Sequence, residues 1–181
     1  MNDPDHALHP GDPAGTSHSQ DGTSRPRAGT RPQTGTRHPQ ALDPAVRDRL
    51  ATERIAWLCT LRPDGSPHVT PVWFVFLRDT WWIGADRASV KVRNVGHDPR
   101  VSLALEGGEA PVVAEGRAKV WHVLPDGGIS DGSHTSRTSP EVVAAFLAKY
   151  DWDATATLPS ASGRVLFEVP VGRWLLAGTA Q

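Results

Sequence analysis

The sequence predicts a mainly β fold in which six antiparallel strands close into a barrel, with a few short helices between them. Short runs of apolar and β-branched residues recur along the chain, and tight turns separate most of them. Helical spacing interrupts this pattern at only three points. Strands joined directly by tight turns pair antiparallel. These observations therefore favour a barrel or closed sheet over a doubly wound parallel sheet.

The composition limits the classes of protein to which the chain can belong. It has 181 residues, 38% of them hydrophobic, and a formal net charge of −1, which fits one folded domain and argues against a nucleic-acid partner. Cys59 is the only cysteine and the histidines lack metal-ligand spacing, so we expect no disulfide, no metal site and a reducing, cytoplasmic setting. No apolar run approaches the roughly 18 residues of a membrane span, so no membrane partner is expected.

The first 42 residues are predicted to form a disordered tail. Beyond Met1, residues 1–40 contain one large aliphatic side chain, Leu8, among proline, glycine, small polar and charged residues. Such a segment buries too little apolar surface to offset the entropy that it loses on ordering. The folded domain is therefore expected to span residues 43–181.

The first half of this domain is predicted to be a helix followed by three strands. Asp43 is a suitable N-cap and Pro44 suits the first helical position, so a short helix is expected to run to about Thr52. Asp64 and Gly65 form the tip of the first hairpin turn. The three strands form a meander over residues 54–61, 66–77 and 81–85.

The second half alternates between helical and extended segments. Residues 86–98 fit either a fourth strand or a helix, and we favour a helix that stops before Pro99. The segment 125–138 is long and polar for a compact domain, which indicates disorder or a lid. Ser139 then caps a helix with one apolar face. The remaining strands are expected over residues 100–106, 112–123 and about 164–175.

The segment "GADRASVKVRNV" has the residues of an anion site. If the helix begins near Ser89, its unpaired N–H groups lie beside that hydroxyl, and Arg87 and Lys91 are one turn apart. A helix N-terminus with two cations is suited to a phosphate. The alternative is a solvated basic helix face, which the spacing alone leaves open.

Pro71 interrupts the strand "SPHVTPVWFVF". This strand is largely apolar on both faces, so we expect both to be buried. Proline has no backbone N–H for a sheet ladder, which predicts that pairing stops between Thr70 and Val72. The free backbone groups then need another partner. A bound heteroaromatic ring would supply one, and a plain β-bulge is the alternative.

Residues 54–120 resemble the pyridoxamine 5′-phosphate oxidase-like, FMN-binding split β-barrel superfamily. They look closest to the branch of oxidoreductases that use FMN or the deazaflavin coenzyme F420. The resemblance lies in "PDGSPHVTPVWF", in Ser89, Lys91 and Asn94 as S-x-K-x-x-N, in "DPRVSL" and in "AEGRA". It implies a six-stranded split barrel and a homodimer with cofactor sites at the interface.

The resemblance also implies which residues bind the cofactor. Its phosphate would lie on Arg87, Ser89 and Lys91, with Arg93 assisting. Trp174 matches a C-terminal aromatic residue near the cofactor, although the ending "VPVGRWLLAGTAQ" departs from the usual pattern. Val92 would be a further cofactor-binding residue. The ring would lie along Val69, Thr70, Pro71, Val72, Trp73 and Ala85.

The predicted function is hydride or electron transfer between bound FMN or F420 and a small electron-poor acceptor. The arginine-rich segment that grips pyridoxamine phosphate in true oxidases of that substrate is missing, so that substrate is not predicted. The cofactor would supply the chemistry, so no catalytic residue is assigned. The alternative is a non-catalytic protein of the same fold that binds or stores FMN, F420 or haem.

Overall fold

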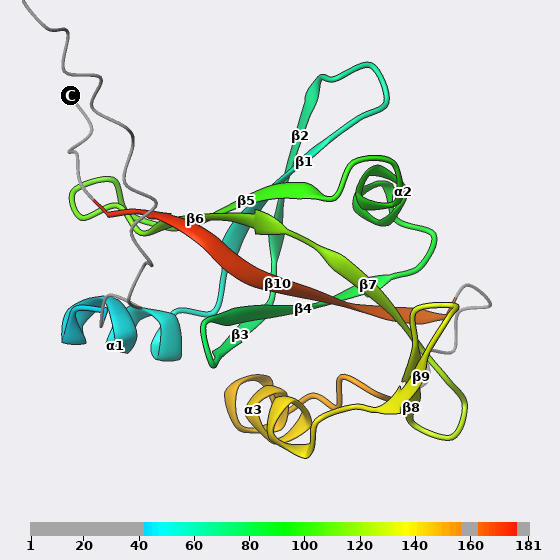
Figure 1. Ribbon diagram of the computed structural model, residues 1–181. Coiled ribbons are helices and arrows are strands. Elements are labelled where there is room, and N and C mark those ends of the chain that lie inside the picture. Colours follow the sequence, from blue (N-terminus) through cyan, green and yellow to red (C-terminus); the bar gives the residue numbers. More distant parts are fainter. Residues whose placement is uncertain (1–41, 157–162, 177–181) are drawn as a thin grey trace, which may run out of the picture. The chain divides into compact units, whose positions relative to one another are not determined.

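The computed structural model describes residues 42–156 and 163–176 (Figure 1). Apart from Leu42, the predicted disordered tail lies outside the described residues, and the domain boundaries stay a prediction. The helices are α1 (Pro44–Thr52), α2 (Val90–His97) and α3 (Pro140–Tyr150). The strands are β1 (Ala56–Leu61), β2 (Pro67–Val72), β3 (Phe74–Leu77), β4 (Thr80–Asp86), β5 (Arg100–Leu105), β6 (Val113–Arg117), β7 (Lys119–Val123), β8 (Gly128–Ser130), β9 (Thr135–Arg137) and β10 (Arg164–Leu175).

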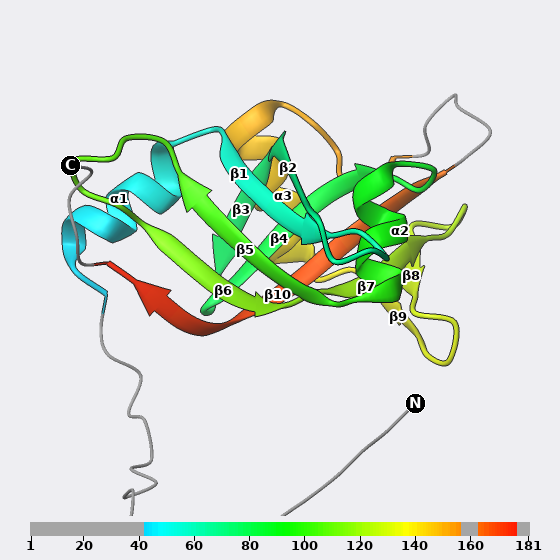
Figure 2. The ribbon, with the colours of Figure 1, turned by 90° about the horizontal axis from the view of Figure 1, so that it is seen from above.

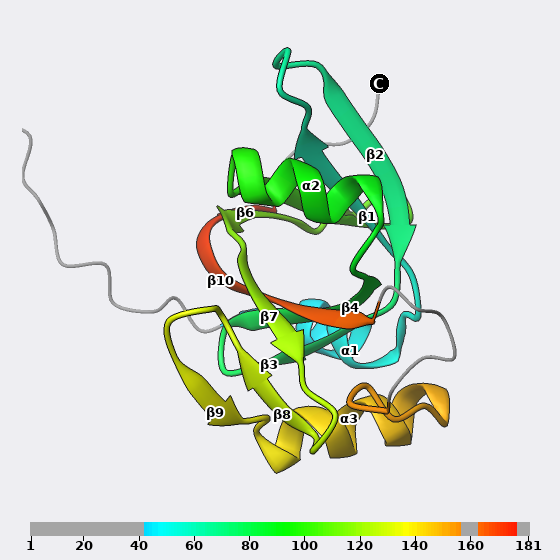
Figure 3. The ribbon, with the colours of Figure 1, turned by 90° about the vertical axis from the view of Figure 1, so that its right-hand side faces the viewer.

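The strands form an antiparallel sheet that folds back on itself without closing, as expected for a split barrel. Its order is β2-β1-β5-β6-β10-β7-β8-β9, and β4 joins β3 to β10. The long strand β10 belongs to both layers, because its first half pairs with β4 and β7 and its second half pairs with β6. Figures 2 and 3 show these two layers and the passage of β10 between them. The predicted mainly β fold is confirmed.

The strand count differs from the six that the sequence predicts, because the sheet has ten strands in the part of the chain that is described. Two predicted strands break as they change layer. The first breaks at Trp73, and the second at Ala118, whose N–H donates to the carbonyl of Pro99 at 2.7 Å. Residues 125–138 contain the hairpin β8–β9, so the expectation of disorder there is wrong, and the alternative of a lid stays a prediction.

The break between β2 and β3 is held by a tyrosine. The buried N–H of Phe74 donates to the hydroxyl of Tyr150 at 3.0 Å, and that hydroxyl lies 2.8 Å from the carbonyl oxygens of Phe74 and Arg54. Pairing continues across Pro71, which lies opposite Trp57 in the ladder of β1 and β2. The expectation that pairing stops between Thr70 and Val72 is therefore wrong. A side chain of α3, rather than a ligand, satisfies the break.

The core has two parts. Between the layers, large buried side chains such as Phe74, Trp81 and Phe167 fill the barrel. A second cluster lies where α3 packs on β3, and it includes Phe146 of α3 and Leu166 of β10 (Figure 1). In the described residues, no helix has the length and apolar character to cross a bilayer.

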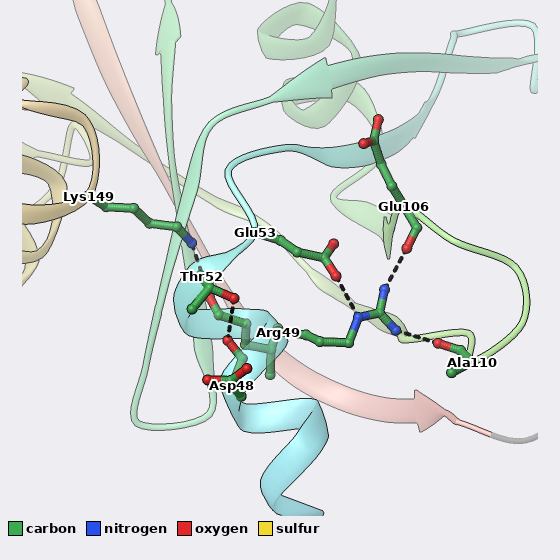
Figure 4. A network of polar contacts seen from close by, with 8 residues as sticks. Asp48, Arg49, Thr52, Glu53, Glu106, Ala110 and Lys149 are labelled. Carbon is green, nitrogen blue, oxygen red and sulfur yellow. Dashed lines mark hydrogen bonds and ion pairs between the residues drawn. The ribbon is translucent and has the colours of Figure 1, made fainter.

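Helices α1 and α2 are fixed to the sheet by polar contacts. In α1, Arg49 binds Glu53 and the carbonyl oxygens of Glu106 and Ala110 (Figure 4). In α2, the buried amide of Asn94 donates to the hydroxyl of Thr60 on β1 at 2.9 Å. The second contact fixes the orientation of α2 and therefore of its N-terminus.

Lys149 of α3 is expected to make the free energy of unfolding depend on pH in the alkaline range. Its ammonium group donates to the carbonyl of Leu50 at 3.0 Å and lies 3.8 Å from the centroid of the Phe74 ring. Burial lowers the pKa of Lys149 from 10.5 to about 8. Between these values the unfolded chain binds more protons than the folded one, so this lysine makes stability rise with pH.

The measurement is urea unfolding of wild type and Lys149→Met at pH 7.5 and pH 10. The methionine variant keeps most of the apolar stem and has no charge to bury. The wild type should therefore gain stability relative to the variant between the two pH values. An equal pH dependence in both proteins would contradict the depressed pKa.

Candidate functional site

A pocket of about 330 Å³ lies where β2 and β4 end, beside the start of α2 and of β10. The pairing of β4 with β10 brings these elements together, because Arg164 lies opposite Asp86 and Val165 lies opposite Ala85. Five of the lining residues are among the cofactor-binding residues predicted from the sequence, namely Pro71, Val72, Trp73, Ala85 and Lys91. The other four were not predicted from the sequence, namely Gly84, Asp86, Trp152 and Arg164.

Aromatic side chains form one wall of the pocket. Trp73, which is 41% exposed, stacks on Tyr150 with 4.7 Å between ring centroids and 12° between ring planes. It meets Trp152 edge-on at 6.0 Å. The indole of Trp152 lies directly over Gly84, where an added Cβ would come within 2.9 Å of its Cζ3 atom. Glycine at this position therefore allows the close approach of Trp152 to the sheet.

The pocket contains two desolvated cations. Burial lowers the pKa of Lys91 and of Arg164, and Arg164 is only 5% exposed. The guanidinium of Arg164 donates to the carbonyl of Asp153 at 2.6 Å and lies 4.2 Å from the centroid of the Trp152 ring. Asp86 is the one carboxylate in the lining, and its Oδ1 accepts the N–H of Ala88 at 2.7 Å. An anionic ligand would offset the desolvation of both cations.

The start of α2 provides a second indication of an anion. Ser89 is the N-cap residue, but its hydroxyl makes no capping hydrogen bond; it is buried and has no partner within the described residues. The first amides of an α-helix also lack partners within the helix. The residues present therefore fit a phosphate group, since its oxygens would accept from the hydroxyl, the helix amides and Lys91.

The other predicted residues lie around this pocket or away from it. Arg87 is exposed, and Arg93 turns back to donate to the carbonyl of Ala88 at 2.7 Å. Val92 packs against the main core. Trp174 packs there too, against Phe76 at 5.7 Å and Trp81 at 6.3 Å between centroids. Trp174 is half-buried, and its contact with a cofactor stays a prediction.

The predicted burial of both faces of β2 is wrong. Thr70 is half-buried, but Val69 is 56% exposed and Pro71 is exposed, because their side chains lie on the outer face of the layer. On the neighbouring strand β1, Trp57 lies opposite Pro71 on the same side of the sheet and is 42% exposed. A groove of about 350 Å³ continues this surface across β1, β5 and β6, which lie side by side in Figure 2. The outer face of this layer thus carries a sizeable apolar surface.

Two of the residues that the sequence analysis missed had a local signal. Gly84 interrupts a strand of large side chains, which is typical of a close approach by another group. Asp86 lies within the predicted anion segment. Trp152 and Arg164 had no comparable signal, because Trp152 follows α3 and Arg164 begins β10, and neither lies in a motif. Among the described residues, no group of three metal-ligating side chains is found.

Comparisons with known proteins agree with this fold. The family described as pyridoxamine 5′-phosphate oxidase matches residues 42–176. An F420 reductase of known structure is 20% identical, with a TM-score of 0.52, over 71% of this chain and 94% of that one. HutZ, the haem storage protein of Vibrio cholerae, is 16% identical, with a TM-score of 0.54, over 77% and 97% of the two chains.

A third structure is closer in sequence but carries no functional information. Atu2129 of Agrobacterium tumefaciens, a protein of unknown function, is 25% identical, with a TM-score of 0.53, over 76% of this chain and 57% of that one. No curated protein matches the chain. The likenesses below 25% identity show the shared fold.

Proposed function

This chain belongs to the pyridoxamine 5′-phosphate oxidase family, and from that premise we propose that it is an oxidoreductase that binds FMN or F420. The observation that carries the proposal is the pocket beside β2, in which aromatic and backbone surface lies next to two desolvated cations. Bound there, either cofactor would supply hydride or electron transfer. The protein's part is to bind the cofactor, orient it and exclude water.

The pocket and the adjoining start of α2 both have a role in this proposal. Ser89, Lys91 and the first amides of α2 hold the phosphate, since together they offer a free hydroxyl, a half-buried cation and a helix N-terminus. Trp73 and the neighbouring end of β2 hold the ring system by packing. Trp152 covers the strand end at Gly84 and keeps water from that side. A small electron-poor acceptor would bind on the exposed side of Trp73.

Haem is less suited to this pocket than a flavin or deazaflavin. The lining residues contain no histidine, cysteine, methionine or tyrosine, the usual axial ligands of haem iron. We therefore propose no haem ligation at this site. Binding or storage of FMN or F420 without turnover is the outcome that would replace the enzymatic proposal.

The experiment that tests the proposal has two steps. The first is to purify the protein, release any bound small molecule and identify it by mass, which distinguishes FMN from F420. The second is to follow oxidation of the reduced cofactor on the protein with and without a panel of electron-poor acceptors. Faster oxidation with one acceptor supports an oxidoreductase. Binding without acceleration by any acceptor would make the protein a carrier instead.

We also propose that the chain forms a homodimer in the cytoplasm. Trp57 and Val69 are exposed on the outer face of β1 and β2, and Cys59, the only cysteine, lies opposite Val69 in the register. Large apolar side chains grouped on one sheet face are typical of an interface. A single unpaired cysteine suits a reducing compartment.

The dimer is tested by Trp57→Glu. A charge at this position would be desolvated in the interface, so sedimentation at micromolar concentration should show monomers for the variant and dimers for the wild type. Leu147, which is exposed on α3, provides the control, and Leu147→Glu should remain dimeric. A dimeric Trp57→Glu protein would place the interface elsewhere.

A further inference from the structure

A second pocket, of about 530 Å³, lies between the hairpin β8–β9 and the start of α3. Figures 1 and 3 show the hairpin beside this helix. The two pockets share no lining residue. The second is lined by Asp126, Gly127, Gly128, Thr135, Ser136, Arg137, Thr138, Ser139, Pro140, Val143 and Thr155.

The start of α3 gives this pocket a positive electrostatic character. The helix has 11 residues with Pro140 in its first turn, and the hydroxyl of its N-cap residue Ser139 makes no capping hydrogen bond. Pro140 has no N–H, and the N–H groups of Val142 and Val143 donate to the carbonyl of Ser139. The amide of Glu141 and the aligned peptide dipoles of the helix N-terminus therefore favour an anion here. Glu141, the acidic residue of the first turn, forms an ion pair with Arg78 at the surface.

Thr138 provides independent support for a ligand. The residue is 7% exposed, and its hydroxyl is buried without a hydrogen-bond partner in the described part of the chain. A buried hydroxyl without a partner is unfavourable, and such groups in native proteins usually have a partner. Thr138 lines the pocket, so an oxygen atom of a ligand there would complete its hydrogen bonding.

The remaining lining residues define the class of ligand. Arg137 contributes an exposed cation beside Thr138 and Ser139. The one carboxylate of the lining belongs to Asp126, whose Oδ1 accepts the N–H of Gly128 at 2.9 Å. Its second oxygen is suited to accept from a ligand hydroxyl. A phosphate at the start of α3 and a hydroxyl group near Asp126 therefore match these two kinds of lining residue.

We propose that this pocket binds a small phosphate monoester with hydroxyl groups on its carbon skeleton. Arg137, Thr138 and Ser139 bind the phosphate together with the N-terminus of α3. Asp126 recognises a hydroxyl group. The site is separate from the cofactor pocket, although residues 152–155 connect the two, since Trp152 lines the first and Thr155 lines the second.

The test is isothermal titration of the full-length protein with glycerol 3-phosphate and with inorganic phosphate. Wild type should bind glycerol 3-phosphate, and Thr138→Val and Arg137→Gln should each weaken that binding about tenfold or more, because each removes a hydrogen bond to a charged group. Valine has nearly the shape of threonine and removes the unpaired hydroxyl, so Thr138→Val should fold normally. Ser133→Ala, outside the lining on the same hairpin, is the matched control and should bind as wild type does.

Lys91→Ala separates this proposal from the proposed function. It alters the cofactor pocket, so it should keep the affinity for glycerol 3-phosphate at the second pocket. Loss of that affinity in Lys91→Ala would show that the ligand binds in the cofactor pocket and would overturn the second site. Absence of binding in wild type, or unchanged affinity in both Thr138→Val and Arg137→Gln, would overturn it too. Equal affinities for inorganic phosphate and glycerol 3-phosphate would overturn the recognition of a hydroxyl by Asp126.

Discussion

Lys91→Ala protein is expected to bind FMN or F420 about 10- to 100-fold more weakly than wild type. The lysine is half-buried at the start of α2, lines the pocket, and has its pKa lowered by burial. A hydrogen bond to a charged group contributes about 1.5–3 kcal/mol, which corresponds to this loss of affinity. Fluorescence titration of the cofactor-free protein with each cofactor measures it.

Two further variants make the result specific. Lys119 lies on β7, outside the pocket lining, and forms an ion pair with Asp131 at 2.7 Å. Lys119→Ala should therefore leave cofactor affinity unchanged. Ser89→Ala removes the hydroxyl that lacks a partner, so it should weaken cofactor binding while folding stability stays the same or rises. If Lys91→Ala binds both cofactors as wild type does, the phosphate does not lie at the start of α2.

Tyr150→Phe is expected to lower the free energy of unfolding by about 2–3 kcal/mol, because it leaves buried backbone groups without a partner. The hydroxyl accepts the N–H of Phe74 at 3.0 Å, and Phe74 is fully buried. The hydroxyl also lies 2.8 Å from two carbonyl oxygens, those of Phe74 and Arg54. Urea unfolding measures the difference.

Tyr150→Phe removes the hydroxyl and leaves the rest of the side chain in place. Phenylalanine keeps the ring that stacks on Trp73, so packing of the pocket wall should be preserved. Thr80→Val serves as the control, since its hydroxyl donates to the carbonyl of Arg78 in a turn at the surface, and its effect should stay within about 0.5 kcal/mol. If Tyr150→Phe lowers the free energy of unfolding no more than the control does, water hydrogen-bonds to the backbone groups between β2 and β3 in place of the tyrosine.

The helix starts could be predicted from the sequence because their signals are local. Asp43 and Pro44 begin α1, and the side chain of Asp43 accepts the N–H of Ala45 at 2.8 Å. Ser139 and Pro140 begin α3 in the same way, although the hydroxyl of Ser139 makes no capping bond. Cap residues and proline act on the backbone within one turn, so a short stretch of sequence is sufficient to recognise them.

The breaks in the strands could not be predicted in the same way. The alternation of side chains shows that residues 66–77 are extended, but it does not show which neighbour each part pairs with. The change of layer at Trp73 depends on Tyr150, which lies 76 residues from Phe74 in the chain. Pro71 was the visible irregularity, yet it is tolerated within β2 because that strand lies at an edge.

The sequence by itself determined the mainly antiparallel β fold, the family and the segment from Asp86 to Lys91 at which an anion is expected. Each of these depends on residue types and spacings within a few positions. Only the tertiary structure decided that Trp152 and Arg164 join Lys91 in one pocket, through the register of β4 and β10. Register and packing are set by contacts between residues far apart in the chain, and local patterns constrain them weakly.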